Sequence, residues 1–220
     1  MLTLYHCVSA RSFRPLWMLE ELGWPYELKM LPFPPRSERR EYLELNPLGT
    51  VPLLIDGELR MTESAAICEY LASRHQPNAL HVAPGEKGYG DYLNFLHFSE
   101  ATLTFPQTLL LRYGRFEPED RRQPQVVEDY RRWFLARLRT LEPRLVASGY
   151  LACGRFTAAD VSVGYALMLA EYQGLQTEFT PAIAAYWQRL RERPAYQAAL
   201  KAERKAALAQ GVEATPSPLA

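Results

Sequence analysis

The stretch Asn46-Pro-Leu-Gly-Thr-Val-Pro-Leu-Leu-Ile-Asp-Gly57 decides the fold of this chain. The pattern predicts a tight turn, then a proline, a short apolar strand and a hairpin turn at the Asp56-Gly57 pair. Pro52 supplies no backbone donor at the start of its strand, and the Val51-Pro52 bond is of the kind that adopts the cis form at modest cost. We therefore expect the Val51 main chain to pair with an extended, peptide-like ligand, as in strand addition.

Glu63 and Ser64 follow the hairpin at the predicted start of a helix, with Thr62 as a suitable N-cap. Free N–H groups and the helix dipole favour a carboxylate at such a position. The whole stretch thus predicts a small peptide that is held by main chain in the middle and by its acidic end on a helix. The alternative is a hairpin and a helix that bind nothing.

The composition restricts the class of protein. The chain has 220 residues, enough for one large domain or two small ones, and a formal net charge of +0, which argues against a nucleic-acid partner. No apolar run approaches the roughly 20 residues of a membrane span, and the N-terminus lacks the features of a secretory signal. Cys7, Cys68 and Cys153 show neither disulfide nor metal spacing, so we expect a reduced, cytoplasmic protein without a metal.

The first 75 residues alternate between strand and helix periods, in the order β-α-β-α-β-β-α, with the first β-α-β unit parallel by the crossover rule. We expect strands at 2–6, 26–31, 51–55 and 58–61 and helices at 12–22, 38–45 and 62–74.

A linker is predicted at 76–86, followed by an all-α domain at 87–210 and a flexible tail at 211–220. Pro106 is expected to kink the first of the later helices. Thr157 and Asp160 form a capping-box pattern before a helix apolar enough to be buried. The later helices are expected at 89–114, 124–148, 158–173, 180–192 and 194–210.

Taken together, the Asn46-to-Gly57 stretch, Thr62-Glu63-Ser64 and Thr157-Ala-Ala-Asp160 resemble the cytosolic glutathione transferases, in particular bacterial, serine-type members. The resemblance implies a thioredoxin-like α/β domain, an all-α helical bundle and a homodimer. It also implies glutathione as co-substrate and an acceptor site in the helical domain for a small hydrophobic electrophile. Asp160 would be a structural cap without a catalytic role.

The resemblance also implies how glutathione is held. The Val51 main chain would pair with the cysteinyl unit beside a cis Pro52, Ser64 and the helix N-terminus would take the γ-glutamyl carboxylate, and Glu63 would position the α-amino group. Thr50 stands where many relatives place a basic residue near the glycyl carboxylate. The missing charge would then come from Arg36, Arg39 or Arg40, each of which is otherwise a solvated surface charge.

The chemistry requires a glutathione thiolate. Lowering a thiol pKa from about 8.5 by one to two units takes about 1.4–2.7 kcal/mol, and one hydrogen bond to a charged group supplies about 1.5–3 kcal/mol. Serine-type relatives read Ser-Arg-Ser before the first helix, whereas this chain reads Ala10-Arg11-Ser12 with a serine at Ser9. We favour Ser9 as the donor, with Ser12 or backbone amides as alternatives. Ser12 is also a natural N-cap, and Arg11 would add positive potential.

Two other interpretations stay open at this point. Cys7 is either a redox thiol, which would make the protein a glutathione-dependent disulfide or peroxide reductase or an isomerase, or a buried small hydrophobe. In the other interpretation, the protein is a non-catalytic module that uses the fold to bind other proteins. The peptide-binding elements argue against this interpretation, because such a module has no need of them. Phe105, Leu109 and Tyr113 are candidates for the acceptor site, although aromatic side chains at this spacing are also typical of a core.

Overall fold

The computed structural model describes residues 1–74 and 77–216, and its contacts divide the chain into two compact units. The first unit comprises Met1–Asn78 and Arg191–Ala220, and the second comprises Ala79–Leu190. The last helix therefore groups with the first unit by contacts, whereas the sequence boundaries place it in a helical domain at 87–210. Its packing against the first helix and the second strand accounts for the difference.

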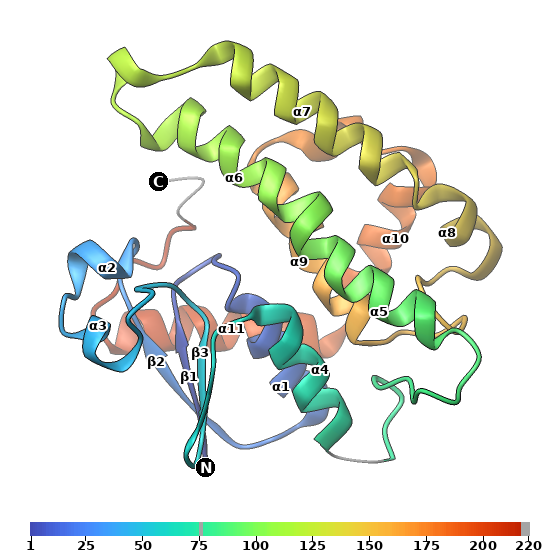
Figure 1. Ribbon diagram of the computed structural model, residues 1–220, viewed down its shortest axis with the longest axis horizontal. Helices are drawn as coiled ribbons and strands as arrows, with labels where there is room; N and C mark the ends of the chain where they lie inside the picture. The colour runs from blue at the N-terminus through green and yellow to red at the C-terminus, as the bar shows by residue number, and fades with distance from the viewer. Residues whose placement is uncertain (75–76, 217–220) are drawn as a thin grey trace. The chain divides into compact units, whose positions relative to one another are not determined.

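The first unit is built on a four-stranded sheet with the order β2-β1-β3-β4 (Figure 1). β1 is parallel to β2, and β3 is antiparallel to both β1 and β4. The predicted element order and the parallel first crossover are confirmed. The strands are β1 (Leu2–His6), β2 (Tyr26–Met30), β3 (Leu53–Asp56) and β4 (Leu59–Met61).

The helices α1 and α4 pack against each other beside this sheet, and α11 packs against α1 (Figure 1). Gly23 ends α1 in the left-handed region, with φ 65°, as its position after Leu22 predicts. The helices of this unit are α1 (Phe13–Leu22), α2 (Pro35–Glu38), α3 (Tyr42–Leu45), α4 (Ser64–Arg74) and α11 (Pro194–Ala209).

Three details differ from the sequence predictions. The single helix expected at 38–45 is two short helices, because a first helix already starts at Pro35 and ends where Arg39 leaves helical geometry (φ −141°). The hairpin turn lies at Gly57-Glu58 rather than at Asp56-Gly57, since Asp56 still pairs with Leu59. Helix α4 starts two residues after Thr62, and its first hydrogen bond runs from the Ile67 N–H to the Glu63 carbonyl.

The segment after α11 continues along the first unit. The Gln210 side-chain amide accepts a hydrogen bond from the Met30 N–H and donates one to the Leu28 carbonyl, both at 2.8 Å, which satisfies part of the edge strand β2. Val212 and Ala214 pack against a cluster that contains Met30. The expected flexible tail thus has contacts up to this point, and residues 217–220 of that tail lie outside the described residues.

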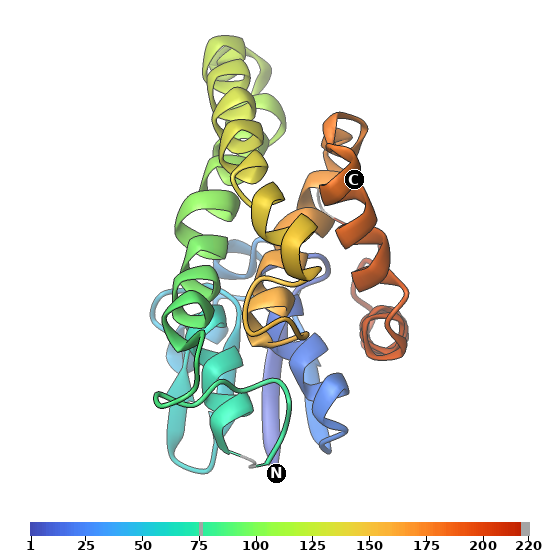
Figure 2. The same cartoon turned by 90° about the vertical axis from the view of Figure 1, so that its right-hand side faces the viewer.

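In the part that the structure describes, the second unit consists of helices and connecting loops, with one isolated bridge between Ala152 and Arg155. α6 and α7 pack along each other, as Figures 1 and 2 both show. The helices are α5 (Tyr89–Phe98), the π-helix η1 (Ser99–Thr104), α6 (Phe105–Leu111), the π-helix η2 (Arg112–Phe116), η3 (Glu119–Arg121), α7 (Pro124–Arg139), α8 (Glu142–Ser148), α9 (Ala158–Tyr172), η4 (Leu175–Glu178) and α10 (Pro181–Arg191).

Prolines explain where the long predicted helices are interrupted. The segment expected as one helix at 89–114 contains the π-helical η1, which ends at Thr104. Pro106 follows in the first turn of α6 and has no N–H with which to continue the α-helical ladder. The segment expected at 124–148 breaks after Arg139, and α8 restarts with a proline in its first turn.

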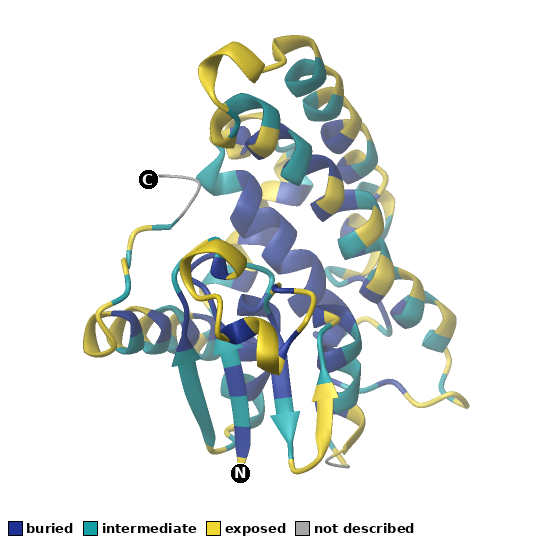
Figure 3. Ribbon diagram, turned by 60° about the vertical axis from the view of Figure 1, so that its left-hand side comes forward, coloured by how far each residue is buried: buried dark blue, intermediate teal, exposed yellow. Residues whose placement is uncertain are grey.

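Helix α9 is buried along nearly its whole length (Figure 3). Thr157 and Asp160 form the predicted capping box at its start: the Thr157 N–H donates to the Asp160 carboxylate at 2.8 Å. The carboxylate also accepts from the Thr157 hydroxyl, the Leu151 N–H and the Tyr186 hydroxyl. Burial nevertheless raises the pKa of Asp160 to about 6.

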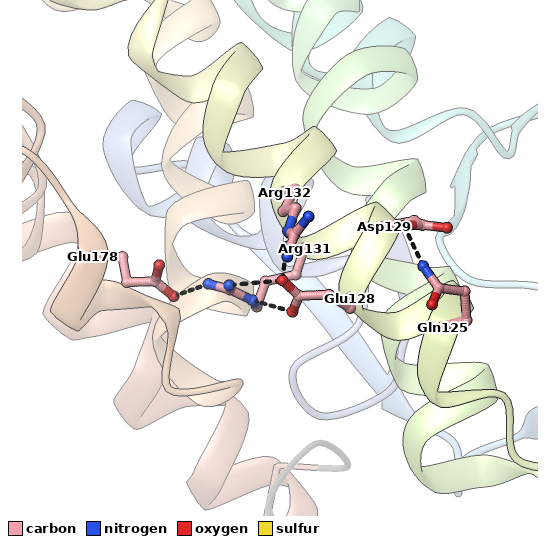
Figure 4. Close-up of polar contacts among 6 residues, drawn as sticks. All are labelled: Gln125, Glu128, Asp129, Arg131, Arg132 and Glu178. Carbon is pink, nitrogen blue, oxygen red and sulfur yellow. Dashed lines mark hydrogen bonds and ion pairs between the residues drawn. The ribbon is translucent and has the colours of Figure 1, made fainter.

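A second polar cluster lies on the surface of the helical unit (Figure 4). The Glu128 carboxylate accepts hydrogen bonds from Arg131 and Arg132, and Arg131 also pairs with Glu178, so α7 is linked to η4. The hydrogen bonds from Arg131 and then Arg132 lower the pKa of Glu128 to about 2.

Candidate functional site

The strand pairing of the first unit brings three predicted site segments to one end of the sheet. Tyr5 of β1 faces Leu53 of β3, and Leu54 faces Met61 of β4. The loop after β1, the Val51-Pro52 pair before β3 and the chain that enters α4 after β4 therefore leave the sheet at the same end. Residues that lie far apart in the sequence thus come together as the peptide-site prediction requires.

The Asn46 side chain builds the turn before β3. Its Oδ1 accepts the Leu48 N–H at 3.2 Å, and its Nδ2 donates to the Thr50 carbonyl at 2.8 Å. The Tyr42 hydroxyl donates to the same carbonyl, also at 2.8 Å. Gly49 needs to be a glycine there, because its φ is 61° and an added Cβ would lie 2.7 Å from the Cβ of Arg36.

These contacts fix the residue that follows. The Val51-Pro52 bond is cis, as is Phe33-Pro34. Val51 lies outside the paired residues of β3, and no hydrogen bond joins its main chain to another residue in the described part of the chain. Its N–H and C=O are therefore available at the end of the sheet.

The first turn of α4 lies beside this position in the topology. Glu63 is exposed and Ser64 is buried. The amides of the first turn have no helical carbonyl to bond. The Ser64 hydroxyl accepts a hydrogen bond at 2.9 Å from the guanidinium of Arg14, which belongs to α1 and is itself fully buried.

Arg14 is a member of the site that the sequence pattern does not indicate. It stands inside a run of α1 in which every residue from Phe13 to Leu19 is buried, so helical periodicity gives no sign of its role. A buried cation behind a helix N-terminus adds positive potential where an anion is expected to bind. Only the packing of α1 against α4 reveals this residue.

The loop after β1 places Ser9 and Ser12 differently. Ser9 has a left-handed backbone, with φ 58°, and its N–H donates to the Glu203 carboxylate at 2.9 Å. Ser12 is fully buried, and its Oγ lies 2.7 Å from His6 Nδ1. Arg11 lies between them and is half-buried.

Ser12 precedes α1, but its side chain does not cap the helix. The reason is that backbone carbonyls of the loop already accept the first amides: Phe13 N–H bonds to the Ala10 carbonyl at 2.8 Å, and Arg14 N–H bonds to the Arg11 carbonyl at 3.2 Å. The Ser12 hydroxyl is thereby released for its contact with His6.

Cys7 is a buried thiol and not an exposed nucleophile. It packs in a cluster with Leu31, Tyr42 and Leu53, and burial, with a smaller effect of the Glu203 charge, raises the pKa of its thiol to about 12. The thiolate is therefore a negligible fraction at neutral pH. This environment does not favour the reductase interpretation.

The remaining predicted residues lie elsewhere. Thr50 and Arg39 are exposed, and Arg39 pairs with Glu41 at 3.5 Å. The acceptor-site candidates Phe105, Leu109 and Tyr113 occur at four-residue spacing along α6 and η2 in the helical unit. Phe105 is exposed, and the other two are half-buried.

The described residues offer little support for other kinds of site. They contain no cluster of three or more His, Cys, Asp or Glu side chains placed to hold a metal ion. They also contain no helix that is both long and apolar enough to cross a membrane. A surface hollow lined partly by Trp24, Asp56 and Arg74 lies at the opposite end of the strands from the peptide-site residues.

Comparisons with known proteins show what the chain and its fold are similar to. Residues 1–73 match the family model of the glutathione S-transferase N-terminal domain. Glutathione S-transferase 4 of Zea mays is 32% identical over 195 residues, which cover 86% of each chain. The solved glutathione transferase URE2P6 from Phanerochaete chrysosporium, in complex with oxidized glutathione, is 30% identical, with a TM-score of 0.81 over 93% of this chain and 97% of that one. A sphingomonad glutathione S-transferase complexed with glutathione is 27% identical, with a TM-score of 0.80 over 91% and 98%.

The fold thus combines the thioredoxin-like domain of glutathione S-transferases with their helical domain, as the sequence predicts. The chain belongs to the glutathione S-transferase family of enzymes.

Proposed function

We propose that this enzyme binds glutathione at the end of the sheet in the first unit and activates its thiol for attack on a small hydrophobic electrophile. The observation that carries the proposal is the Val51 main chain, which is unpaired next to cis Pro52 while Asn46 and Tyr42 fix the adjacent Thr50 carbonyl. A tripeptide in extended form pairs with such a segment through its own main chain.

The γ-glutamyl end would bind at the start of α4. The first amides of this helix and the Ser64 hydroxyl take the carboxylate, and the exposed Glu63 takes the α-amino group. The buried guanidinium of Arg14 orients the Ser64 hydroxyl and supports an anion there. For the glycyl carboxylate, Arg36 is better placed than Arg39, because its Cβ lies against Gly49, one residue before Thr50.

Ser9 is the proposed donor to the thiolate, in a serine-type mechanism with Arg11 adding positive potential. Both serines are buried, and Ser9 is favoured over Ser12 because the Ser12 hydroxyl is bonded to His6. One hydrogen bond to the thiolate stabilises it by about 1.5–3 kcal/mol, which lowers the thiol pKa by one to two units. Proximity to the bound electrophile supplies the rest of the rate increase.

The electrophile would bind along α6 and η2. An apolar face that is not fully buried is formed there by Phe105, Leu109 and Tyr113. Family membership and the three free thiols support a homodimer in a reducing, cytoplasmic compartment. Sedimentation of the purified chain tests the dimer directly.

Two measurements test the proposal. Millimolar glutathione should raise the melting temperature of the purified protein, because a ligand that binds only the folded state stabilises it. The protein should conjugate glutathione to a generic aryl halide, and Ser9→Ala should lower that rate by about tenfold or more. Ser37→Ala, at an exposed serine of the same unit, is the matched control and should not change it.

Absence of both the melting shift and conjugation would contradict the proposed function. A Ser9→Ala variant as active as the Ser37→Ala control would remove Ser9 alone from its role. Ser64→Ala should weaken glutathione binding by about tenfold, the loss expected for one charge-assisted hydrogen bond.

A further inference from the structure

Three buried polar side chains of the first unit form a chain of hydrogen bonds that ends at the Ser9 loop. The Glu203 Oε2 lies 2.7 Å from His6 Nε2 and accepts the Ser9 N–H at 2.9 Å. His6 Nδ1 lies 2.7 Å from the Ser12 Oγ. His6 and Ser12 are fully buried, and Glu203 is 5% exposed. Neither the family model nor the proposed glutathione contacts involve Glu203, which lies on α11.

The direction of each hydrogen bond follows from the chemistry of the groups. An ionised carboxylate only accepts, so His6 Nε2 carries a proton that it donates to Glu203. In a neutral imidazole, Nδ1 is then an acceptor, and the Ser12 hydroxyl donates to it. The Ser12 oxygen also accepts the Cys7 N–H at 3.4 Å. With a neutral imidazole, the hydroxyl proton of Ser12 is thus used inside the unit.

These contacts hold the loop at two points. Ser12 is tied to β1 through His6, and Ser9 is tied to α11 through the same carboxylate that bonds His6. The left-handed backbone of Ser9, with φ 58°, is uncommon for a residue with a side chain and persists only where surrounding contacts fix it. The Glu203 carboxylate is the contact that bonds the Ser9 N–H itself.

We propose that Glu203, His6 and Ser12 are positioning residues that hold Ser9 in its left-handed conformation and aim its hydroxyl at the glutathione sulfur. Helix α11 then contributes to thiol activation through Glu203. The proposal rests on the proposed function for its link to the thiol, while its claim about the loop is independent of any ligand.

The first experiment measures the thiol pKa of bound glutathione, from thiolate ultraviolet absorbance against pH, together with kcat and KM. Glu203→Ala should raise that pKa by about one unit and lower kcat about tenfold, since one unit is a tenfold change in ionisation. KM for glutathione should change less than about threefold, because the contacts at Val51 and Ser64 are untouched.

Glu203→Gln is the conservative rescue. A glutamine oxygen still accepts from both His6 and Ser9, so this variant should stay within about threefold of the wild-type kcat. If Glu203→Ala does not fold, His6→Phe replaces it, because it breaks the same chain of hydrogen bonds with a side chain of similar shape. Failure of Glu203→Gln to restore activity would overturn a positioning role.

Arg193→Ala is the matched control for loss of stability. Arg193 joins α11 to α1 through two hydrogen bonds to Glu21, at 2.6 and 2.8 Å, and it lies ten positions before Glu203 in the sequence. It should lower the melting temperature while leaving the thiol pKa unchanged. An equal rise in thiol pKa for Arg193→Ala and Glu203→Ala would overturn the proposal, since general loosening of α11 would then explain both.

The second experiment is hydrogen exchange of the peptide that contains residues 7–12, without ligand. Exchange should accelerate in Glu203→Ala but not in Arg193→Ala. Unchanged exchange in Glu203→Ala overturns the positioning role whether or not glutathione binds. A wild-type protein that binds no glutathione overturns the proposed function and the link to the thiol, and the exchange result then decides the loop claim by itself.

Discussion

Both units bury a carboxylate among hydrogen-bond donors, Asp160 in one and Glu203 in the other, and the donors of the two carboxylates belong to different kinds of segment. Asp160 accepts from Thr157, Leu151 and Tyr186, all of which hold the start of α9 in place. Glu203 accepts from His6, at the end of β1, and from Ser9, in the loop that follows at the proposed glutathione site. The chemistry is the same in both units, so the role of a buried carboxylate is decided by the segment that it fixes.

The largest expected effect is a loss of stability when the Asp160 carboxylate is removed. Asp160→Ala would leave several buried donors unpaired, among them the Leu151 N–H and the Tyr186 hydroxyl. We expect the free energy of unfolding to fall by about 3–5 kcal/mol, since each unpaired buried group costs about 1–3 kcal/mol. Urea denaturation measures the loss.

The matched control for this variant is Asp91→Ala in the same unit. Asp91 pairs with Arg144 through two hydrogen bonds of 2.7 Å, but its side chain is 42% exposed. Water replaces such contacts, so the control should lose little. Equal losses in the two variants would break the distinction between a buried and an exposed carboxylate.

The pH dependence of stability tests the effect of burial on Asp160. Burial raises the pKa of Asp160 from 3.8 to about 6, so the folded state binds more protons than the unfolded state between these values. Stability from this group is therefore full below about pH 4, falls by up to about 3 kcal/mol as the pH rises to about 6, and is level above that.

The measurement is the difference in unfolding free energy between the wild type and Asp160→Asn across that pH range, because the asparagine does not titrate. The four donors act against burial on this carboxyl. The free-energy difference could instead grow in favour of the wild type as the pH rises. That result would mean that the hydrogen bonds outweigh burial and that the pKa of Asp160 lies below its ordinary value.

The two carboxylates also differ in how far the sequence predicts them. The Thr157-to-Asp160 spacing is local, so the amino-acid sequence alone predicts a capping box there. Glu203 lies 197 positions from His6 and stands between alanines and basic residues, a pattern typical of a solvated helix face. Only the packing of α11 against α1 and β2 reveals its partners.

The same contrast holds for the fold and the candidate site. The order of elements along the chain and the Val51-Pro52 and Glu63-Ser64 segments follow from local patterns, because each depends on a few neighbouring residues. The two-helix break at Arg39 and the turn at Gly57-Glu58 depend on backbone geometry that residue type leaves open. Arg14 stands outside every local pattern, since its burial arises from the contact between α1 and α4.

A smaller loss of stability is expected when one hydrogen-bond donor to Asp160 is removed. Tyr186→Phe keeps the ring and deletes the hydroxyl that bonds the carboxylate at 2.8 Å. We expect a loss of about 1–2 kcal/mol in unfolding free energy at neutral pH. That hydrogen bond lowers the pKa of Asp160, so its removal should raise the pKa further.

The midpoint of the pH-dependent loss should therefore move upward in Tyr186→Phe, which a pH series of urea denaturations detects. Trp187→Phe, at the neighbouring position in α10, is a control because the Trp187 indole bonds Glu171 and not Asp160. A shift of the same size in both variants would show that repacking of α10, and not the hydroxyl, sets the carboxyl pKa.

The smallest effect is expected at the surface cluster, although Glu128 has nearly as many contacts as Asp160, which accepts four hydrogen bonds. The Glu128 carboxylate accepts three hydrogen bonds, two from Arg131 and one from Arg132, more than Glu203 accepts (Figure 4). Both partners remain in water when the contact breaks, and salt screens their attraction. Glu128→Gln should therefore leave the melting temperature unchanged within error at moderate salt, with a slight fall only at low salt. A fall as large as that of Tyr186→Phe would mean that contact number, and not burial, governs these carboxylates, because Glu128 differs from Asp160 chiefly in its access to water.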